Sequence, residues 1–206
     1  MRIVLKPAGI FVLLLAIGAL VLIAFKKSPP PLAAVRATPT PRTAPTPRTA
    51  PTPANLAVNP DMAAQGQNGF PDNWEVFWSE GGKLVASQDT TQGRTAPPSL
   101  KIDTRDVAGK GQVAQLITVT PGEKITVNGS VKALGTGTFS FAVQFYNNRH
   151  TPVGFQHVAL VKPGSGWRSG KDTVTVPDQS AEMGIVLYAD GVGSAWLDDV
   201  TVTRVP

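Results

Sequence analysis

Short runs in which apolar and polar residues alternate make up most of the chain from residue 55 onward. Apolar side chains recur at every second position of 139–145 and of 125–131, where Gly129 is the one interruption. This period of two places one face of an antiparallel strand on a core and leaves the other face outside it. No segment past residue 55 has a capped helical stripe. The sequence therefore predicts an all-β domain over 55–206.

Gly, Pro, Asn and Asp divide this region into short candidate strands. We predict them at 55–59, 74–79, 83–88, 99–104, 111–120, 124–133, 137–147, 155–162, 171–176, 182–189 and 194–205. Many short strands separated by turn signals are typical of a sandwich or barrel. The predicted fold is a jelly-roll β-sandwich.

An uninterrupted apolar segment at 8–25 follows Arg2 and Lys6. As a helix it would span about 27 Å, enough for the hydrocarbon core of a membrane. A cleaved signal peptide has a shorter apolar run with a small-residue cleavage site soon after it. We therefore expect 1–27 to be an uncleaved signal-anchor helix, with cleavage and secretion as the alternative.

Residues 28–54 are rich in Pro and Thr and repeat the hexad Pro-Thr-Pro-Arg-Thr-Ala. Dense proline removes backbone donors and favours extended polyproline II, so this segment cannot build a core of its own. We expect it to be a disordered linker that holds the domain away from the membrane.

Positive charge is concentrated before residue 55. Of the 19 basic residues, seven lie in 1–54 together with none of the 14 acidic residues, so 55–206 carries a net charge of −2. A nucleic-acid-binding domain needs a basic patch on its folded surface, and we expect no such partner. The Lys and Arg residues after the apolar segment outnumber those before it, which favours a cytoplasmic domain. We nevertheless expect export, because of the short basic N-terminus and the type of domain.

Several motifs occur in a defined order across 55–206. They are Asn55-Leu56-x-x-Asn59-Pro60-Asp61, Gly69-Phe70-Pro71-x-x-Trp74, Gln115-x-Ile117-x-Val119-x-Pro121-Gly122, Gly166-Trp167 and Trp196-Leu197-Asp198-Asp199-Val200. In order and spacing they resemble carbohydrate-binding modules of the family 4/9/22 type. The resemblance implies a galactose-binding-type jelly roll that binds a polysaccharide or glycan on a concave sheet or at a loop edge. It also implies that Trp74 and Trp167 are core residues, and we expect Trp196 to join them.

The resemblance further implies a structural calcium ion, and here the sequence departs from the family. Ala63 stands where the family has a Glu ligand, whereas Asp198 of the terminal Asp-Asp-Val is present. Calcium takes six to eight oxygen ligands. Asp198 is therefore the candidate metal ligand, with calcium or no cofactor at all as the two alternatives.

Sugar recognition needs an exposed aromatic face beside amide, carboxylate or guanidinium groups. If the Phe residues of 139–145 face the core, the intervening positions face outward, and an Asn-rich turn follows them. The predicted ligand-binding residues, which fall on exposed strand faces or at their ends, are Trp78, Gln144, Tyr146, Asn148, Arg149 and Tyr188. The alternative is an ordinary solvated strand face and turn.

No catalytic arrangement is recognisable. The chain lacks Cys and an HExxH motif, and the neighbours Asp198 and Asp199 would point to opposite faces of a strand. We therefore expect a non-enzymatic, membrane-tethered module at the cell surface that binds a polysaccharide or glycan. The alternatives are an adhesion module for a protein partner and a hydrolase without a recognisable motif.

Overall fold

The computed structural model describes residues 52–80, 84–104, 108–164 and 166–206. The predicted anchor at 1–27, and residues 28–51 of the predicted linker, lie outside the described residues. In the described part of the chain, no helix has the length and apolarity needed to cross a membrane. The one helical element found there is a short 3₁₀ turn, η1 (Gln67–Gly69).

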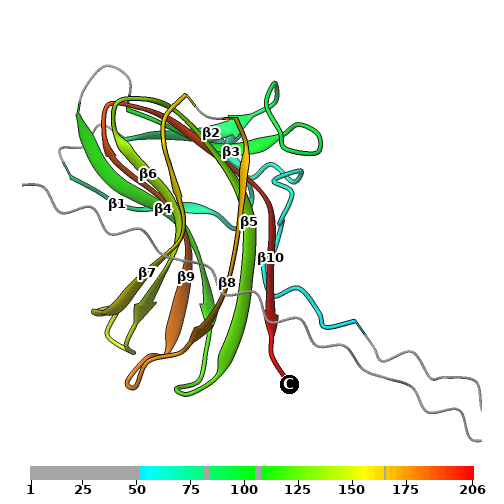
Figure 1. Cartoon of the computed structure of the whole chain (residues 1–206), viewed down its shortest axis with the longest axis vertical. Coiled ribbons are helices and arrows are strands. Elements are labelled where there is room, and N and C mark those ends of the chain that lie inside the picture. Colours follow the sequence, from blue (N-terminus) through cyan, green and yellow to red (C-terminus); the bar gives the residue numbers. More distant parts are fainter. Residues whose placement is uncertain (1–51, 81–83, 105–107, 165) are drawn as a thin grey trace, which may run out of the picture. The chain divides into compact units, whose positions relative to one another are not determined.

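Ten strands in the described ranges form two five-stranded antiparallel sheets (Figure 1). The first sheet has the order β1 (Glu75–Glu80), β4 (Gly109–Thr118), β9 (Glu182–Gly191), β6 (Thr138–Tyr146) and β7 (Pro152–Val161). The second has the order β2 (Val85–Asp89), β3 (Ser99–Asp103), β10 (Gly193–Arg204), β5 (Lys124–Gly135) and β8 (Arg168–Thr175). The prediction of an all-β sandwich is confirmed.

Ten of the predicted strands correspond to these elements, whereas the strand predicted at 55–59 is wrong. In that segment the side chain of Asn55 makes hydrogen bonds to the backbone of β10 that a paired strand would otherwise make. Its amide nitrogen donates to the carbonyl of Val200 at 3.0 Å, and its oxygen accepts from the backbone N–H of Val202 at 2.7 Å. An amide side chain thus takes backbone hydrogen bonds on β10 that a neighbouring strand would otherwise make.

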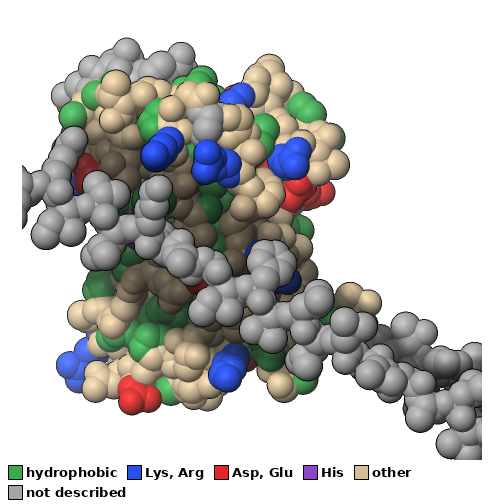
Figure 2. Space-filling view, viewed as in Figure 1, with side chains coloured by type: hydrophobic (Ala, Val, Ile, Leu, Met, Phe, Trp, Pro, Cys, Tyr) green, Lys and Arg blue, Asp and Glu red, His purple; other side chains and the backbone are tan. Residues whose placement is uncertain are grey.

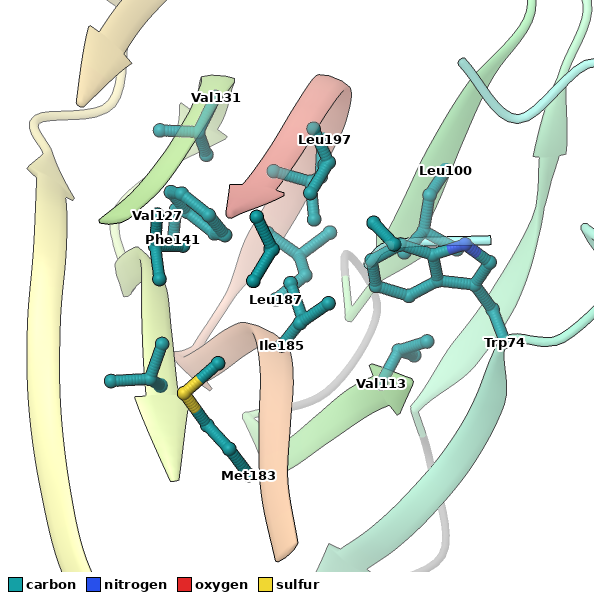
Figure 3. Close-up of a cluster of buried hydrophobic side chains, with 14 of the residues drawn as sticks. Trp74, Leu100, Val113, Val127, Val131, Phe141, Met183, Ile185, Leu187 and Leu197 are labelled. Carbon is teal, nitrogen blue, oxygen red and sulfur yellow. The ribbon is translucent and has the colours of Figure 1, made fainter. Parts of the chain in front are cut away.

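The core lies between the two sheets, where side chains from β5 and β10 point toward those from β6 and β9 (Figure 3). All four apolar residues of the 139–145 alternation are buried, as predicted: Phe139, Phe141, Val143 and Phe145. Trp74 is also buried in this cluster. Each such side chain contributes about 1.5–3 kcal/mol through the apolar area it removes from water.

Gly129 breaks the apolar alternation of β5 for a steric reason. A Cβ at this position would come within 2.9 Å of the ring of Phe141 on the opposite sheet. The aromatic ring fills the space that a side chain on β5 would occupy, so the two residues are complementary in size.

The other two expected core tryptophans lie elsewhere. Trp167 is half-buried and stands outside the buried cluster. Trp196 is buried on the outer face of the second sheet, where its Nε1 donates to Asp89 at 2.8 Å and two lysine ammonium groups approach its ring. Its cross-strand neighbours Lys101 and Lys132 supply those groups, 5.6 and 5.4 Å from the centre of the indole.

The surface divides by chemistry along the domain. On the face shown in Figure 2, charged side chains stand mainly toward the two ends, and hydrophobic side chains are visible in the recessed middle.

Candidate functional site

The outer face of the first sheet is strongly curved. On the intervening strand β9, Gln112 of β4 pairs with Tyr188, and Tyr146 of β6 pairs with Glu182. These two partners on β9 are six residues apart. In a flat sheet this offset alone separates Gln112 from Tyr146 by about 20 Å, more than their side chains can bridge. Nevertheless, Gln112 Nε2 donates to Tyr146 Oη at 2.7 Å. The face must therefore be concave.

Seven side chains line a groove of about 260 Å³ on this concave face. They come from all five strands of the sheet: Trp78, Lys110, Gln112, Gln144, Phe155, His157 and Tyr188. The register explains the grouping, because Trp78 pairs with Gln112, Gln112 with Tyr188, and Gln144 with Phe155. The groove thus runs across the strands of the sheet, from the edge strand β1 to the edge strand β7.

Small buried residues lie beneath the surface beside the groove. Ala114, Ala142 and Val186 make a separate cluster on this face, against which Phe77 and Tyr188 pack. Phe77 sits where the register of β1 and β4 shifts, between Val76 and Trp78. Such a bulge lets two successive aromatic side chains serve the same face.

Three aromatic rings give the groove its apolar character. Trp78 and Phe155 belong to the edge strands and are 37% and 40% exposed. Phe155 meets Tyr188 edge-on at a centroid distance of 5.8 Å, and His157 at 4.9 Å. These contacts fix the ring of Phe155 while its exposed surface stays available for a ligand.

The polar groups of the groove are held by specific partners. Gln144 Nε2 donates to the carbonyl of Gly154 at 2.7 Å, which aims its amide. His157 Nδ1 lies 2.9 Å from Ser140 Oγ, so its Nε2 is the ring nitrogen available to a ligand. Side chains fixed in this way lose little conformational freedom when they bind a ligand.

One end of the groove carries charge. Lys110 Nζ lies 3.5 Å from Asp190, and Tyr188 Oη donates to the same carboxylate oxygen at 3.1 Å. The pKa of Lys110 is raised by the electrostatic influence of Tyr188 and then of Asp190. Burial, followed by the Asp190 carboxylate, raises the pKa of Tyr188. At neutral pH the groove therefore presents a neutral phenol beside a charged lysine.

A second hollow of about 320 Å³ continues from this end. Lys110 and Asp190 line it together with Glu80, Ala108, Gly109 and Gly191. Because Lys110 belongs to both hollows, the two form one extended surface. An extended ligand therefore has room beyond the aromatic groove.

The structure brings together Trp78, Gln144 and Tyr188 of the predicted site residues. Tyr146 faces the predicted side of the sheet, but the expectation that it is exposed is wrong. Only 2% of its surface is accessible, because the ring of Phe77 packs on it at 4.9 Å. Tyr146 supports Gln112 from below the surface and does not line the groove.

Asn148 and Arg149 do not join this groove. They line a separate hollow at the end of β6, together with residues of the 179–181 loop. The sequence reasoning also missed groove residues, among them Gln112, Phe155 and His157. Phe155 and His157 lie two positions apart in a predicted strand, a spacing that places both on one face. The sequence pattern does not show which strand lies beside them.

Asp198 is buried, and both of its carboxylate oxygens already have donors. Oδ2 accepts from the backbone N–H of Arg94 at 2.7 Å, and Oδ1 from that of Asp199 at 2.8 Å. Burial raises its pKa. In the described residues, no three His, Cys, Asp or Glu side chains are grouped so as to hold a metal ion. This arrangement fits a hydrogen-bonded carboxylate and does not fit the calcium site that the resemblance implies.

No protein-family model matches the chain, and no curated protein matches it. Solved structures with the same fold include the CBM22-1 xylan-binding domain of Paenibacillus barcinonensis Xyn10C, with a TM-score of 0.55 and 16% identity, covering 76% of this chain and 97% of that domain. TmCBM61 in complex with β-1,4-galactotriose matches with a TM-score of 0.50 and 12% identity, covering 74% of this chain and 99% of that one.

The enzymatically active domain of bacteriophage CBA120 tailspike protein 4 matches with a TM-score of 0.58 and 15% identity. The match covers 73% of this chain but 21% of the tailspike chain. At these identities the three similarities establish the fold, which is the jelly roll of such carbohydrate-binding modules.

Proposed function

We propose that this domain binds a polysaccharide or another glycan without catalysing a reaction, and that the ligand lies in the concave groove. The observation that carries this proposal is the convergence of Trp78, Phe155 and Tyr188 beside the amide of Gln144 and the imidazole of His157. Aromatic faces pack against the C–H faces of pyranose rings, and fixed amide and imidazole groups match the hydroxyls.

The solved structures with this fold support the proposal. One is described as a xylan-binding domain and another as a complex with β-1,4-galactotriose. The groove is open at both edges of its sheet, since its ends are formed by the edge strands β1 and β7. We therefore propose that the ligand is an internal segment of a β-linked polysaccharide chain. We also propose that the domain is a carbohydrate-binding module of the family 4/9/22 type.

A binding role also fits the chemistry of the carboxylates near the groove. Asp190 is held by Tyr188 and Lys110, which suits a positioned acceptor for a hydroxyl. Glycosidases need a pair of carboxyl groups placed on either side of the scissile bond. The seven described residues that line the groove include no Asp or Glu, while Glu80 and Asp190 line the adjoining hollow.

We further propose that residues 1–27 anchor the chain in the cell membrane and that 28–54 form the spacer to an extracytoplasmic domain at 55–206. The apolar segment 8–25 and the proline repeat support this arrangement. Protease added to intact cells should release the domain by cutting in the linker. A domain that is cut only after cell lysis would instead indicate cytoplasmic placement.

The binding function is tested with the full-length chain in detergent. Native gels containing soluble xylan, galactan or mixed-linkage glucan should retard the protein in at least one case, whereas Trp78→Ala should migrate as in a gel without polysaccharide. A matched control is Leu160→Ala, which removes another exposed side chain of an edge strand that does not line the groove. Equal mobility of the folded wild-type chain in all gels would overturn the proposal.

A further inference from the structure

The hollow at the end of β6 and the start of β9 has a different chemistry from the concave groove. It measures about 480 Å³ and is lined by Asn147, Asn148, Arg149, Gln179, Ser180 and Ala181. We propose that it is a second binding site, specific for an anionic oxygen group such as the carboxylate of a uronic acid or a sulfate ester on a glycan.

Backbone hydrogen bonds hold one wall of this hollow in place. Asn147 Oδ1 accepts from the N–H groups of Arg149 and Thr151 at 2.9 and 3.0 Å. The backbone of Asn147 also donates to Thr151 and accepts from His150, both at 3.0 Å. A turn closed by these four bonds presents Asn148 and Arg149 on a defined support.

The opposite wall is tied to the end of β6. The backbone N–H of Ala181 donates to the carbonyl of Tyr146 at 2.8 Å, and that of Ser180 donates to Pro177 at 3.3 Å. Both walls are therefore positioned by main-chain bonds that do not depend on a ligand. Such preorganisation lowers the entropic cost of binding.

Ser180 adds an unpartnered hydroxyl group to this lining. The residue is 4% exposed and lines the hollow, yet its Oγ has no hydrogen-bond partner in the described part of the chain. Buried polar atoms are nearly always partnered, because an unsatisfied one costs about 1–3 kcal/mol. After a rotation about χ1 that turns the hydroxyl toward the hollow, it would donate a hydrogen bond to a ligand oxygen, which would remove this cost.

The charge of the lining favours an anion. Of the described residues that line the hollow, Arg149 is ionisable and none is Asp or Glu, and Arg149 forms no ion pair with the described part of the chain. The acids Glu182, whose Oε2 lies 3.0 Å from His150 Nδ1, and Asp178, which is exposed, both stand outside the lining. A guanidinium binds a planar or tetrahedral oxyanion through two parallel hydrogen bonds.

The hollow also lacks what a neutral sugar ring requires. None of the described residues that line it is aromatic, so they offer the ligand no flat apolar surface, in contrast to the groove with its three rings. Amide donors from Asn148 and Gln179 would supplement the guanidinium. This site therefore selects for charge, and the groove selects for ring shape, so the inference does not depend on the proposed function of the groove.

The test uses the full-length chain in detergent, with isothermal titration of tetragalacturonate, sodium sulfate and neutral xylotetraose. Arg149→Gln should weaken tetragalacturonate binding at least tenfold and leave xylotetraose binding unchanged. Ser180→Ala should weaken it several-fold. Arg168→Gln, which removes another exposed arginine on β8, is the matched control and should bind as the wild type does.

The outcomes separate the two sites. Binding of sulfate without binding of tetragalacturonate would indicate a sulfate ester as the ligand. Binding of tetragalacturonate would indicate a uronate. Both results support the oxyanion site. Equal tetragalacturonate affinity in the wild type and Arg149→Gln, or no binding of either anion, overturns it. If Trp78→Ala loses xylotetraose binding but still binds the anions, the groove binds the neutral sugar and the second hollow binds the anion independently.

Discussion

The side-chain amide of Gln112 donates a 2.7 Å hydrogen bond to the hydroxyl of Tyr146, joining β4 to β6 across β9, and both residues are buried. This bond exists because the sheet curves toward its outer face. It leaves Gln112 in the groove lining and places Tyr146 beneath Phe77. Tyr146 is thus a structural support of the groove.

Tyr146→Ala should destabilise the domain by about 3–5 kcal/mol, as expected for the deletion of a large buried aromatic side chain. Tyr146→Phe keeps the ring but leaves Gln112 Nε2 without this acceptor, at a cost of about 1–3 kcal/mol. Urea denaturation followed by tryptophan fluorescence measures both. Little change in stability for Tyr146→Ala would mean that the residue is exposed in solution.

Stability should fall between pH 10 and 12 through Tyr146. Burial raises the pKa of this phenol from 10.0 to about 12, so in that window the folded state holds a proton that the unfolded state has lost. The contribution is present below pH 10, is lost as the pH rises, and amounts to at most about 2.7 kcal/mol. Tyr188 shifts in the same direction, so the difference between the wild type and Tyr146→Phe isolates the Tyr146 part in urea titrations across this range.

Phe155→Ala should weaken glycan binding about tenfold with a small effect on stability, since 40% of the side chain is exposed and its ring is free to meet a ligand. Depletion of the chain from solution by insoluble xylan or galactan measures the affinity. Val85→Ala, at an exposed position on the other sheet, is the control. Equal losses in both variants would place the ligand away from the groove.

Gly129→Val should destabilise the sandwich by about 1–3 kcal/mol, because the new Cβ would contact the Phe141 ring at 2.9 Å. Gly166→Ala is the matched control, since a Cβ there meets nothing within 4 Å. Thermal unfolding should separate the two variants. If both melt alike, the packing of Phe141 against β5 is looser than described.

Calcium should not raise the melting temperature, and EDTA should not lower it, because two backbone N–H groups occupy the carboxylate of Asp198. Differential scanning fluorimetry with about 10 mM calcium, roughly ten times the weakest Kd of about 10⁻³ M for extracellular calcium sites, checks this. A clear upward shift that disappears in Asp198→Asn would restore the metal site implied by the family resemblance.

Local patterns determined much of the fold. The alternation at 139–145 identified both β6 and the side chains it buries, because a strand has a period of two wherever it pairs. The strand predicted at 55–59 failed because the Asn55 side chain takes the hydrogen bonds that a ladder would use. That competition depends on Val200 and Val202, which are distant in sequence.

For the candidate site, periodicity assigned Gln144 and Tyr146 to the same face, and the structure agrees. Periodicity could not show that Phe77, which lies at a bulge of β1, covers Tyr146, whereas Gln144 stays at the groove. Exposure is a property of the whole sheet, since neighbouring strands decide what each side chain meets.

The sequence by itself determined that 55–206 is a β-sandwich with a buried Phe-rich strand, because alternation and turn residues act locally. Only the tertiary structure decided which outward side chains share a surface. The register across five strands, and the curvature that brings Gln112 to Tyr146, unite Trp78, Phe155 and Tyr188 in one groove and place Arg149 in another hollow. Pairing between distant strands sets these positions, and no local pattern encodes it.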